Sequence, residues 1–291
     1  MFHGISTAIL GPVGLAYVVQ LQNDTQATRL AYFGFSRSLV SLSAPLAAGV
    51  SLTIFDFEMV FIIIGIGSLT AMIPIILLDN KIASVSKKNV VSWRKIGVAI
   101  HESISIPAVW MAGLLEMLVY SIVYSLRAFL PLFIVSQTDG SILQAGLFFS
   151  IQEIIHMAFR PIGAKIADSK GYRLTIVLGM FLLSISLFSV EFFVGHSLLV
   201  LALFIGIGQG LILPASVALL AEEANKNYQG TTMGVYGSLR NIGKVLGPVC
   251  AGFGLANYDF SVFFMALAVI ISLTTIIVML FWNILARTDV L

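Results

Sequence analysis

Long runs of apolar residues alternate with short polar segments along almost the whole chain. A helix needs about 20 mainly apolar residues to cross the hydrocarbon core of a bilayer. Runs of that length occur at approximately residues 2–21, 31–53, 58–78, 106–135, 142–163, 174–194, 198–221, 229–254 and 260–284. Backbone groups in lipid have to be paired within the segment, and the alternation typical of barrel strands is missing. The pattern therefore predicts an all-α fold, a polytopic transmembrane helical bundle with about nine spans.

The composition agrees with a protein that lies in a membrane. Of the 291 residues, 58% are hydrophobic and only 10% are charged, whereas about 25% are charged in a soluble domain. The net charge of +2 is too small to indicate a nucleic-acid partner. The single cysteine, Cys250, lies within a predicted span, so no disulfide or cysteine zinc site is expected.

The charged residues between the spans predict which way the chain crosses the membrane. Alternate connections carry all the basic residues: Arg29, Lys81, Lys87, Lys88, Arg94, Lys95, Lys165, Lys170, Arg173, Lys226 and Arg287. The other connections carry acidic residues and no Lys or Arg: Asp56, Glu58, Asp139, Glu191 and Asp259. By the positive-inside rule the first set is cytoplasmic. This orientation places the C-terminus in the cytoplasm and Met1 outside.

Two stretches of the chain repeat each other without a gap. Residues 34–49 (GFSRSLVSLSAPLAAG) and 237–252 (GSLRNIGKVLGPVCAG) match at five positions: Gly34/Gly237, Arg37/Arg240, Pro45/Pro248, Ala48/Ala251 and Gly49/Gly252. The two copies have the same predicted orientation. Parallel halves related about the membrane normal are one architecture of secondary transporters, so the repeat predicts two pseudo-symmetric halves.

Two motifs are similar to those of the major facilitator superfamily. Residues 164–173 (AKIADSKGYR) resemble the cytoplasmic signature loop of that family, with Asp168, Gly171 and Arg173 at the expected places. The eighth span also resembles the glycine motif of proton-linked antiporters, through Gly234, Gly243, Gly247 and Pro248, which predicts close helix packing. In drug antiporters that motif lies on the fifth helix. The corresponding stretch here keeps only Pro45 and Gly49, which weakens an assignment to drug efflux.

The resemblance implies a domain organisation. The spans correspond to the fourth to twelfth helices of the family, so three family helices would precede residue 1. We expect an incomplete N-terminal half at 1–79, a cytoplasmic loop at 80–105 and a C-terminal six-helix half at 106–291. The loop holds either a short interfacial helix or a solvated tether. The signature loop would act as a gate, with Asp168 meeting the positive N-terminus of the other half's fifth helix near residues 29–33.

Polar residues inside the spans are the candidate functional residues, because they are costly in lipid and usually face protein or water. Glu116, Tyr120, Tyr124 and Arg127 lie within about 80° of one another on a helix of 100° per residue. They form either a wall of a substrate cavity or, for the charged pair, a structural ion pair. Arg127 can also snorkel to the interface.

The next span places Glu153, His156 and Arg160 on one face. A carboxylate beside an imidazole can exchange a proton at neutral pH, although such groups also link helices by hydrogen bonds. Arg160 is expected to be an interface anchor. Gln209 is predicted either to line the cavity or to serve in packing.

Arg240 and Lys244 share a small-residue face of the eighth span, and Arg37 is their counterpart in the repeat. Burying these cations has a desolvation cost that a carboxylate, Glu116 or Glu153, or an anionic substrate could offset. With Arg127 the candidate cavity holds four basic groups against two carboxylates. This excess favours an anionic or amphiphilic substrate.

The sequence as a whole predicts secondary active transport of a small solute by alternating access, coupled to protons through Glu116, Glu153 and His156. Family analogy favours efflux over uptake. The alternative is a non-transporting remnant of a transporter or a membrane scaffold. No catalytic motif occurs in the chain, so no enzyme, cofactor or metal is expected. The expected partners are the solute, protons and the lipid of the cell membrane, and the expected state is a monomer.

Overall fold

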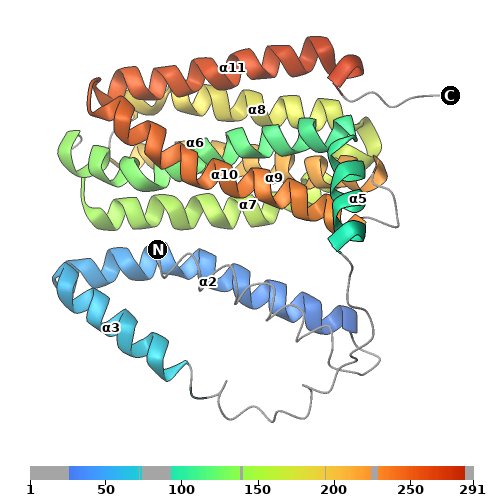
Figure 1. The fold of residues 1–291 in the computed structure, drawn as a ribbon. Coiled ribbons are helices and arrows are strands. Elements are labelled where there is room, and N and C mark those ends of the chain that lie inside the picture. The colour runs from blue at the N-terminus through green and yellow to red at the C-terminus, as the bar shows by residue number, and fades with distance from the viewer. Residues whose placement is uncertain are drawn as a thin grey trace. The chain divides into compact units, whose positions relative to one another are not determined.

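A computed structural model describes residues 26–71, 73, 93–137, 140–193, 195–223 and 229–285. Every regular element in these ranges is a helix (Figure 1), which confirms the predicted all-α bundle. The first predicted span, 2–21, lies outside the described residues. The chain divides into two compact units, Met1–Val90 and Val91–Leu291.

The first unit contains two described helices, α2 (Gln26–Ile54) and α3 (Phe57–Thr70). They correspond to the predicted spans at 31–53 and 58–78. A two-residue turn at Phe55 and Asp56 separates them, and Asp56 occupies the N-cap position of α3. Most large apolar side chains of α3 are exposed, as expected for a surface that meets lipid.

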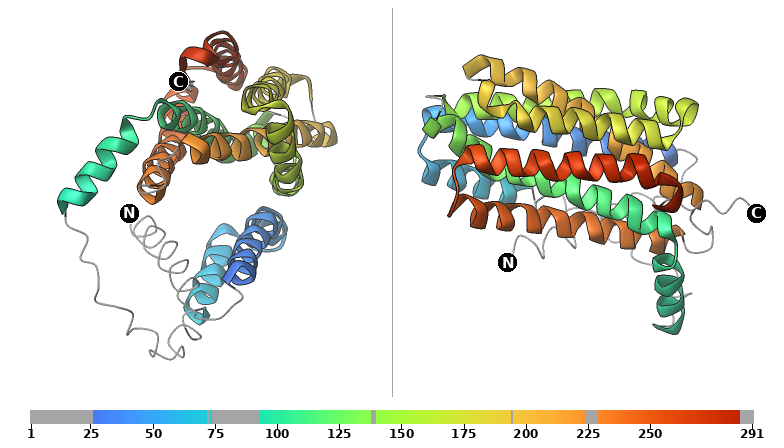
Figure 2. Two further views of the ribbon diagram at one scale, coloured as in Figure 1. Left: turned by 90° about the vertical axis from the view of Figure 1, so that its right-hand side faces the viewer. Right: turned by 90° about the horizontal axis from the view of Figure 1, so that it is seen from above.

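The second unit begins with α5 (Trp93–Ile104) and continues through six further α-helices, which lie side by side in Figures 1 and 2. These are α6 (Pro107–Gln137), α7 (Ile142–Lys170), α8 (Tyr172–Phe188), α9 (Leu198–Glu223), α10 (Gln229–Leu255) and α11 (Phe260–Leu285). The closest packing occurs between α7 and α9, α6 and α10, α8 and α9, and α8 and α11. The six predicted spans of this half therefore form helices.

Among the described residues, four helices are long and apolar enough to cross a membrane: α6, α7, α9 and α11. Shorter apolar helices occur at Leu39–Ile54, Phe57–Thr70 and Tyr172–Phe188. Helix α10 is long but is in neither group, and it carries Arg240 and Lys244 among glycines. Its polar residues therefore need partners inside the protein.

The large apolar side chains of the second unit fall into two groups. A continuous core that includes Ile122, Phe148, Met180 and Phe264 is buried between the helices. Further apolar side chains, above all on α10 and α11, remain exposed on the outside. A helix bundle with apolar residues both inside and outside is typical of a protein in lipid.

Several predicted helix boundaries differ from the structure, and the differences at the two ends of α8 lie next to glycines with positive φ. The signature segment 164–173 is helical up to Lys170, and only Gly171, with φ of 91°, separates α7 from α8. A residue with a side chain is strained at that φ, so the turn requires glycine. Helix α8 ends at Phe188 instead of 194. Two 3₁₀ turns follow it, and Gly195 in the second has φ of 62°.

The segment before α6 is a helix and not an irregular tether. Ala99 and Ser103 of α5 are buried, and the Ser103 hydroxyl lies 3.0 Å from the Thr232 hydroxyl at the start of α10. Residues 93–104 of the 80–105 connection are therefore helical, and a position of this helix at the membrane interface stays a prediction. Residues 80–92 lie outside the described ranges.

Candidate functional site

Close packing of α6 and α10 brings the two predicted polar faces together. A Cβ atom added at Gly243 would lie 2.9 Å from the Met117 Cα, and one added at Gly247 would lie 2.7 Å from the Ser121 Cα. Only glycine allows the two backbones to come so near. The Ser121 hydroxyl lies 3.1 Å from the Gly243 carbonyl oxygen and links the helices at this point.

The four polar residues of the α6 stripe lie on one face, as predicted. The Tyr120 and Tyr124 rings are neighbours, with centroids 6.1 Å apart, and the Arg127 guanidinium is 5.5 Å from the Tyr124 centroid. Glu116, one turn before Tyr120, is almost completely buried, with 1% of its side chain exposed. A carboxylate buried to this extent needs a cation or a proton.

The cations of α10 lie against this stripe. Arg240 Nη1 is 4.0 Å from Glu116 Oε2, and the Arg240 guanidinium is 5.7 Å from the Tyr120 ring centroid. Lys244 Nζ lies 5.1 Å from the Tyr120 centroid and 5.7 Å from the Tyr124 centroid. These are distances at which the negative face of an aromatic ring attracts a cation.

The pairing of Glu116 is incomplete. Tyr236, one turn before Arg240, also interacts with the Glu116 carboxylate. Glu116 Oε2, the Tyr236 hydroxyl and Arg240 Nε are nevertheless all buried without a hydrogen bond of normal geometry. Three unsatisfied polar atoms in one cluster are unusual, because each has a desolvation cost of about 1–3 kcal/mol. The cluster is therefore suited to accept a proton or a polar group of a ligand.

A cavity of about 410 Å³ opens beside this cluster. Its polar lining comes from Glu116 and Tyr120 of α6, Arg160 of α7 and Arg240 of α10. Its apolar lining comes from α9: Leu213, Pro214, Val217, Ala218 and Ala221. One charged wall and one apolar wall suit a small amphiphilic molecule.

A second charged cluster lies on α7. Arg127 Nη2 of α6 donates a hydrogen bond of 2.9 Å to Glu153 Oε2, and His156 Nδ1 is 3.6 Å from Glu153 Oε1. Arg160 Nε donates to His156 Nε2 at 3.2 Å. Arg160 also lines the cavity, so it connects the two clusters instead of acting only as an interface anchor. The four side chains form one continuous series from Arg127 to the cavity.

Gln209 does not line that cavity. Its side-chain oxygen accepts a hydrogen bond from Gln152 Nε2 in the buried contact between α7 and α9. The neighbouring Gly208 and Gly210 pack closely against α8 and α7. The geometry corresponds to the packing alternative for Gln209.

The remaining candidates of the second unit do not line the cavity. Arg37 is on α2 in the first unit, and its side chain lies outside the described part of the chain. Asp168 is exposed near the end of α7. The Arg173 guanidinium donates a hydrogen bond to the Met279 carbonyl oxygen of α11. Gly234 meets no described atom within 4 Å of an added Cβ, and Pro248 lies within α10 next to Gly247. In the described ranges, no three His, Cys, Asp or Glu side chains gather to hold a metal ion.

Sequence comparison identifies the family to which the chain belongs. The family model described as Major Facilitator Superfamily matches residues 1–168 and, overlapping, 109–289. The chain belongs to the major facilitator superfamily. It is thus a multi-pass membrane protein of a transporter family and not of an enzyme family, which confirms the resemblance found in the motifs.

Three similar proteins illustrate the relationship, and all three come from prokaryotes. The chain is 23% identical over 287 residues to an uncharacterized MFS-type transporter, MJ1560, of Methanocaldococcus jannaschii, covering 94% of this chain and 72% of the relative. It is 27% identical over 280 residues to the uncharacterized MFS-type transporter YuxJ of Bacillus subtilis, covering 91% and 68%. The quinolone resistance protein NorA of Staphylococcus aureus is 32% identical over 111 residues, 37% of this chain and 28% of NorA.

Sequence reasoning missed two residues: Tyr236, which lies in the Glu116 cluster, and Gln152, which lies in the packing contact with Gln209. Tyr236 carries no charge and lies near a span end, so nothing in its local pattern separated it from an interfacial tyrosine. Gln152 precedes Glu153 on a different side of α7. A signal was available for Tyr236, since it is four residues before Arg240 and therefore on the same helix face.

Proposed function

We propose that the chain carries out secondary active transport of a small amphiphilic anion, coupled to protons, and that the cavity beside Glu116 and Arg240 binds the solute. The supporting observation is the buried Glu116 carboxylate at the cavity wall, with Oε2 lacking a hydrogen bond and lying 4.0 Å from Arg240 Nη1. This arrangement lets the cation change partner. When Glu116 is protonated, Arg240 is available to an anion.

The charge of the lining favours an anionic solute. Arg160 and Arg240 face the cavity with a single carboxylate, Glu116. The apolar wall of α9 provides burial for the carbon part of the molecule. Among the described residues that line the cavity, Glu116 is the only carboxylate, so no second one would attract a cation.

The proposed proton path uses the second cluster. Glu153 and His156 lie within 3.6 Å of each other, and Arg160 connects His156 to the cavity. A change of protonation on this pair alters the field at Arg160 and therefore at the bound solute. Together with Glu116 this gives two acidic positions at which a proton can be exchanged.

We propose efflux as the direction. Relatives that match part of the chain are named for quinolone resistance, and the orientation predicted from the basic connections would put Arg240 in the cytoplasmic half of its span. Alternating access would then expose the cavity first to the cytoplasm, with the C-terminus on the same side.

The test is a pair of substitutions in the purified chain, with binding measured for a panel of amphiphilic anions that includes a quinolone. Arg240→Gln should weaken binding by about 2–5 kcal/mol, the cost of removing one partner of a buried charge pair, more than tenfold in affinity. The elution and thermal unfolding of the variant should stay near those of the parent.

The contrary result has a distinct signature. If Arg240 serves only to neutralise Glu116, Arg240→Gln should lower stability, and the double variant Arg240→Gln, Glu116→Gln should recover it. Unchanged affinity together with unchanged stability in Arg240→Gln would overturn both roles for this arginine.

A further inference from the structure

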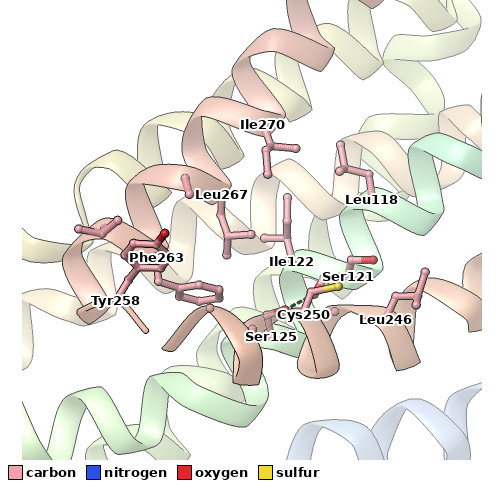
Figure 3. A pocket seen from close by; sticks show the side chains of 15 residues that line it. Leu118, Ser121, Ile122, Ser125, Leu246, Cys250, Tyr258, Phe263, Leu267 and Ile270 are labelled. Atoms are coloured by element: carbon pink, nitrogen blue, oxygen red, sulfur yellow. Dashed lines mark hydrogen bonds between the residues drawn. The ribbon is translucent and has the colours of Figure 1, made fainter. Parts of the chain in front are cut away.

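A second and larger cavity lies behind α6, away from the charged site. It has a volume of about 720 Å³ and is formed by α6, α10 and α11 (Figure 3). Leu118 and Ile122 of its lining are two residues beyond Glu116 and Tyr120, and positions two apart on a helix point about 200° apart. The two cavities therefore lie on opposite faces of α6.

Its size is unlike a packing defect. Protein interiors contain few voids larger than a water molecule, whereas pockets for drug-sized ligands measure about 300–1,000 Å³. The lining side chains labelled in Figure 3 converge from three helices and are mainly aliphatic or aromatic. Apolar cavities of this kind hold apolar ligands and not water.

The two serine hydroxyls of the lining are already engaged. The Ser121 hydroxyl lies 2.7 Å from the Met117 carbonyl oxygen, and the Ser125 hydroxyl donates to the Ser121 carbonyl oxygen at 2.7 Å. Neither hydroxyl needs a partner from a ligand. The walls thus match a hydrocarbon chain better than a polar solute.

The cavity opens between α10 and α11. Helices α10 and α11 separate along their length from the turn that joins them (Figures 1 and 2). Along the two sides, Val249 and Phe253 of α10 and Met265 and Val269 of α11 are exposed. Acyl chains of a bilayer around the second unit would contact these exposed apolar rows and reach the opening from the side.

The depth of the cavity corresponds to one leaflet. Its lining runs from Tyr258, in the turn after α10, to Leu246, nine residues before the end of that helix. Nine residues of helix span about 13 Å, and half of the hydrocarbon core measures about 15 Å. Tyr258 is exposed at the mouth, and tyrosines concentrate at the level of lipid headgroups.

We propose that this cavity binds one acyl chain of a phospholipid from the leaflet opposite the cytoplasm, with its headgroup near Tyr258 and its chain end near Leu246. The occupant would fill the space between α10 and α11 and hold α11 at its observed distance from α10. The site is independent of the solute cavity on the other face of α6.

Photocrosslinking in reconstituted vesicles tests the proposal. The full chain is placed in phosphatidylcholine vesicles that contain a small fraction of phosphatidylcholine with a diazirine at the end of one acyl chain. Adducts should concentrate in the peptides that contain Leu118 and Leu246. Moving the diazirine close to the carbonyl of the chain should move the adducts toward Tyr258.

Filling the cavity supplies the matched control. Ala266 and Ile270 both line it and are exposed, so tryptophan there occupies the cavity without entering the packed core. Ala266→Trp, and as a second variant Ile270→Trp, should lower adduct formation at least fivefold. Ile276→Trp, exposed on the same helix beyond the last lining residue, should leave it unchanged.

Three results would overturn the proposal. Adducts that spread evenly along α10 and α11 and ignore both filling substitutions would show ordinary lipid contact. Adducts at the cavity from a diazirine fatty acid but not from the phospholipid would show a site for small free amphiphiles. Cys250 is the only cysteine in the sequence and lines the cavity, so efficient Cys250–Cys250 disulfide formation on oxidation would show that a second copy of the chain covers this face.

Discussion

Replacing Gly247 with alanine is the sharpest perturbation of the contact between α6 and α10. The new Cβ would lie 2.7 Å from the Ser121 Cα and carbonyl carbon, about 0.7 Å closer than the 3.4 Å at which ordinary contact begins. Both atoms belong to backbone and cannot move aside as a side-chain end can. Helix α10 therefore has to shift outward.

Three contributions determine the size of the effect. Overpacking costs about 1–3 kcal/mol. The outward shift also stretches the hydrogen bond between the Ser121 hydroxyl and the Gly243 carbonyl oxygen, whose length is 3.1 Å. Such a bond between helices contributes about 0.6 kcal/mol in a membrane protein. Alanine recovers up to about 1 kcal/mol through its higher helix propensity. We expect a net loss of about 1–3 kcal/mol.

The assay is thermal unfolding of the purified chain in detergent, with Gly252→Ala as the matched control. Gly252 is on the same helix as Gly247. A Cβ added there meets only Phe129 Cζ of α6, at 3.6 Å, which is an ordinary van der Waals contact. Gly252→Ala should be neutral or slightly stabilising, whereas Gly247→Ala and Gly243→Ala should unfold at lower temperatures. If all three variants unfold together with the parent, the close approach of α10 to α6 is wrong.

Three further predictions concern other parts of the chain. Glu153→Gln should abolish transport driven by a proton gradient while leaving solute exchange largely intact, and a normal pH dependence of transport in the variant would show that Glu153 and Arg127 form only a structural pair. Gly171→Ala should lower the free energy of unfolding by about 1–3 kcal/mol, because it forces a side chain into a backbone conformation, with φ of 91° and ψ of 153°, that is essentially restricted to glycine; equal denaturation midpoints for variant and parent would contradict this strain. Asp168→Asn should change the rate at which a reporter cysteine, Ala221→Cys in a Cys250→Ser background, is alkylated from the cytoplasmic side. An unchanged rate would show that the signature segment only connects α7 to α8.

The helices could be predicted from the sequence because the hydropathy of each segment alone determines whether it forms a spanning helix. A span of about 20 apolar residues must be helical in lipid, and the predicted spans from 106 onward all overlap a helix. The rule fails where a local conformation decides the boundary. Helix α8 stops at Phe188 because the following residues turn, and hydropathy does not register this.

The polar stripe on α6 was predictable for the same reason, since the 100° spacing depends on one helix alone. The pairing of charges was not. Which carboxylate meets Arg240 depends on how α10 slides along α6, and the sequence left Glu116 and Glu153 as equal candidates. In the structure, the position of α10 along α6 puts Arg240 beside Glu116, whereas Glu153 lies beside Arg127.

Register between α6 and α10 connects packing to function. Gly243 is adjacent to Lys244 and three residues after Arg240, so the residues that bring the backbones together also fix the height of both cations. Attraction between a cation and an aromatic ring weakens beyond about 6 Å, and Lys244 Nζ lies at 5.1 and 5.7 Å from its two rings. An outward shift of α10 by a fraction of an ångström would take at least one ring out of that range. The glycine motif therefore does more than allow dense packing, because it sets the distances on which the charged site depends.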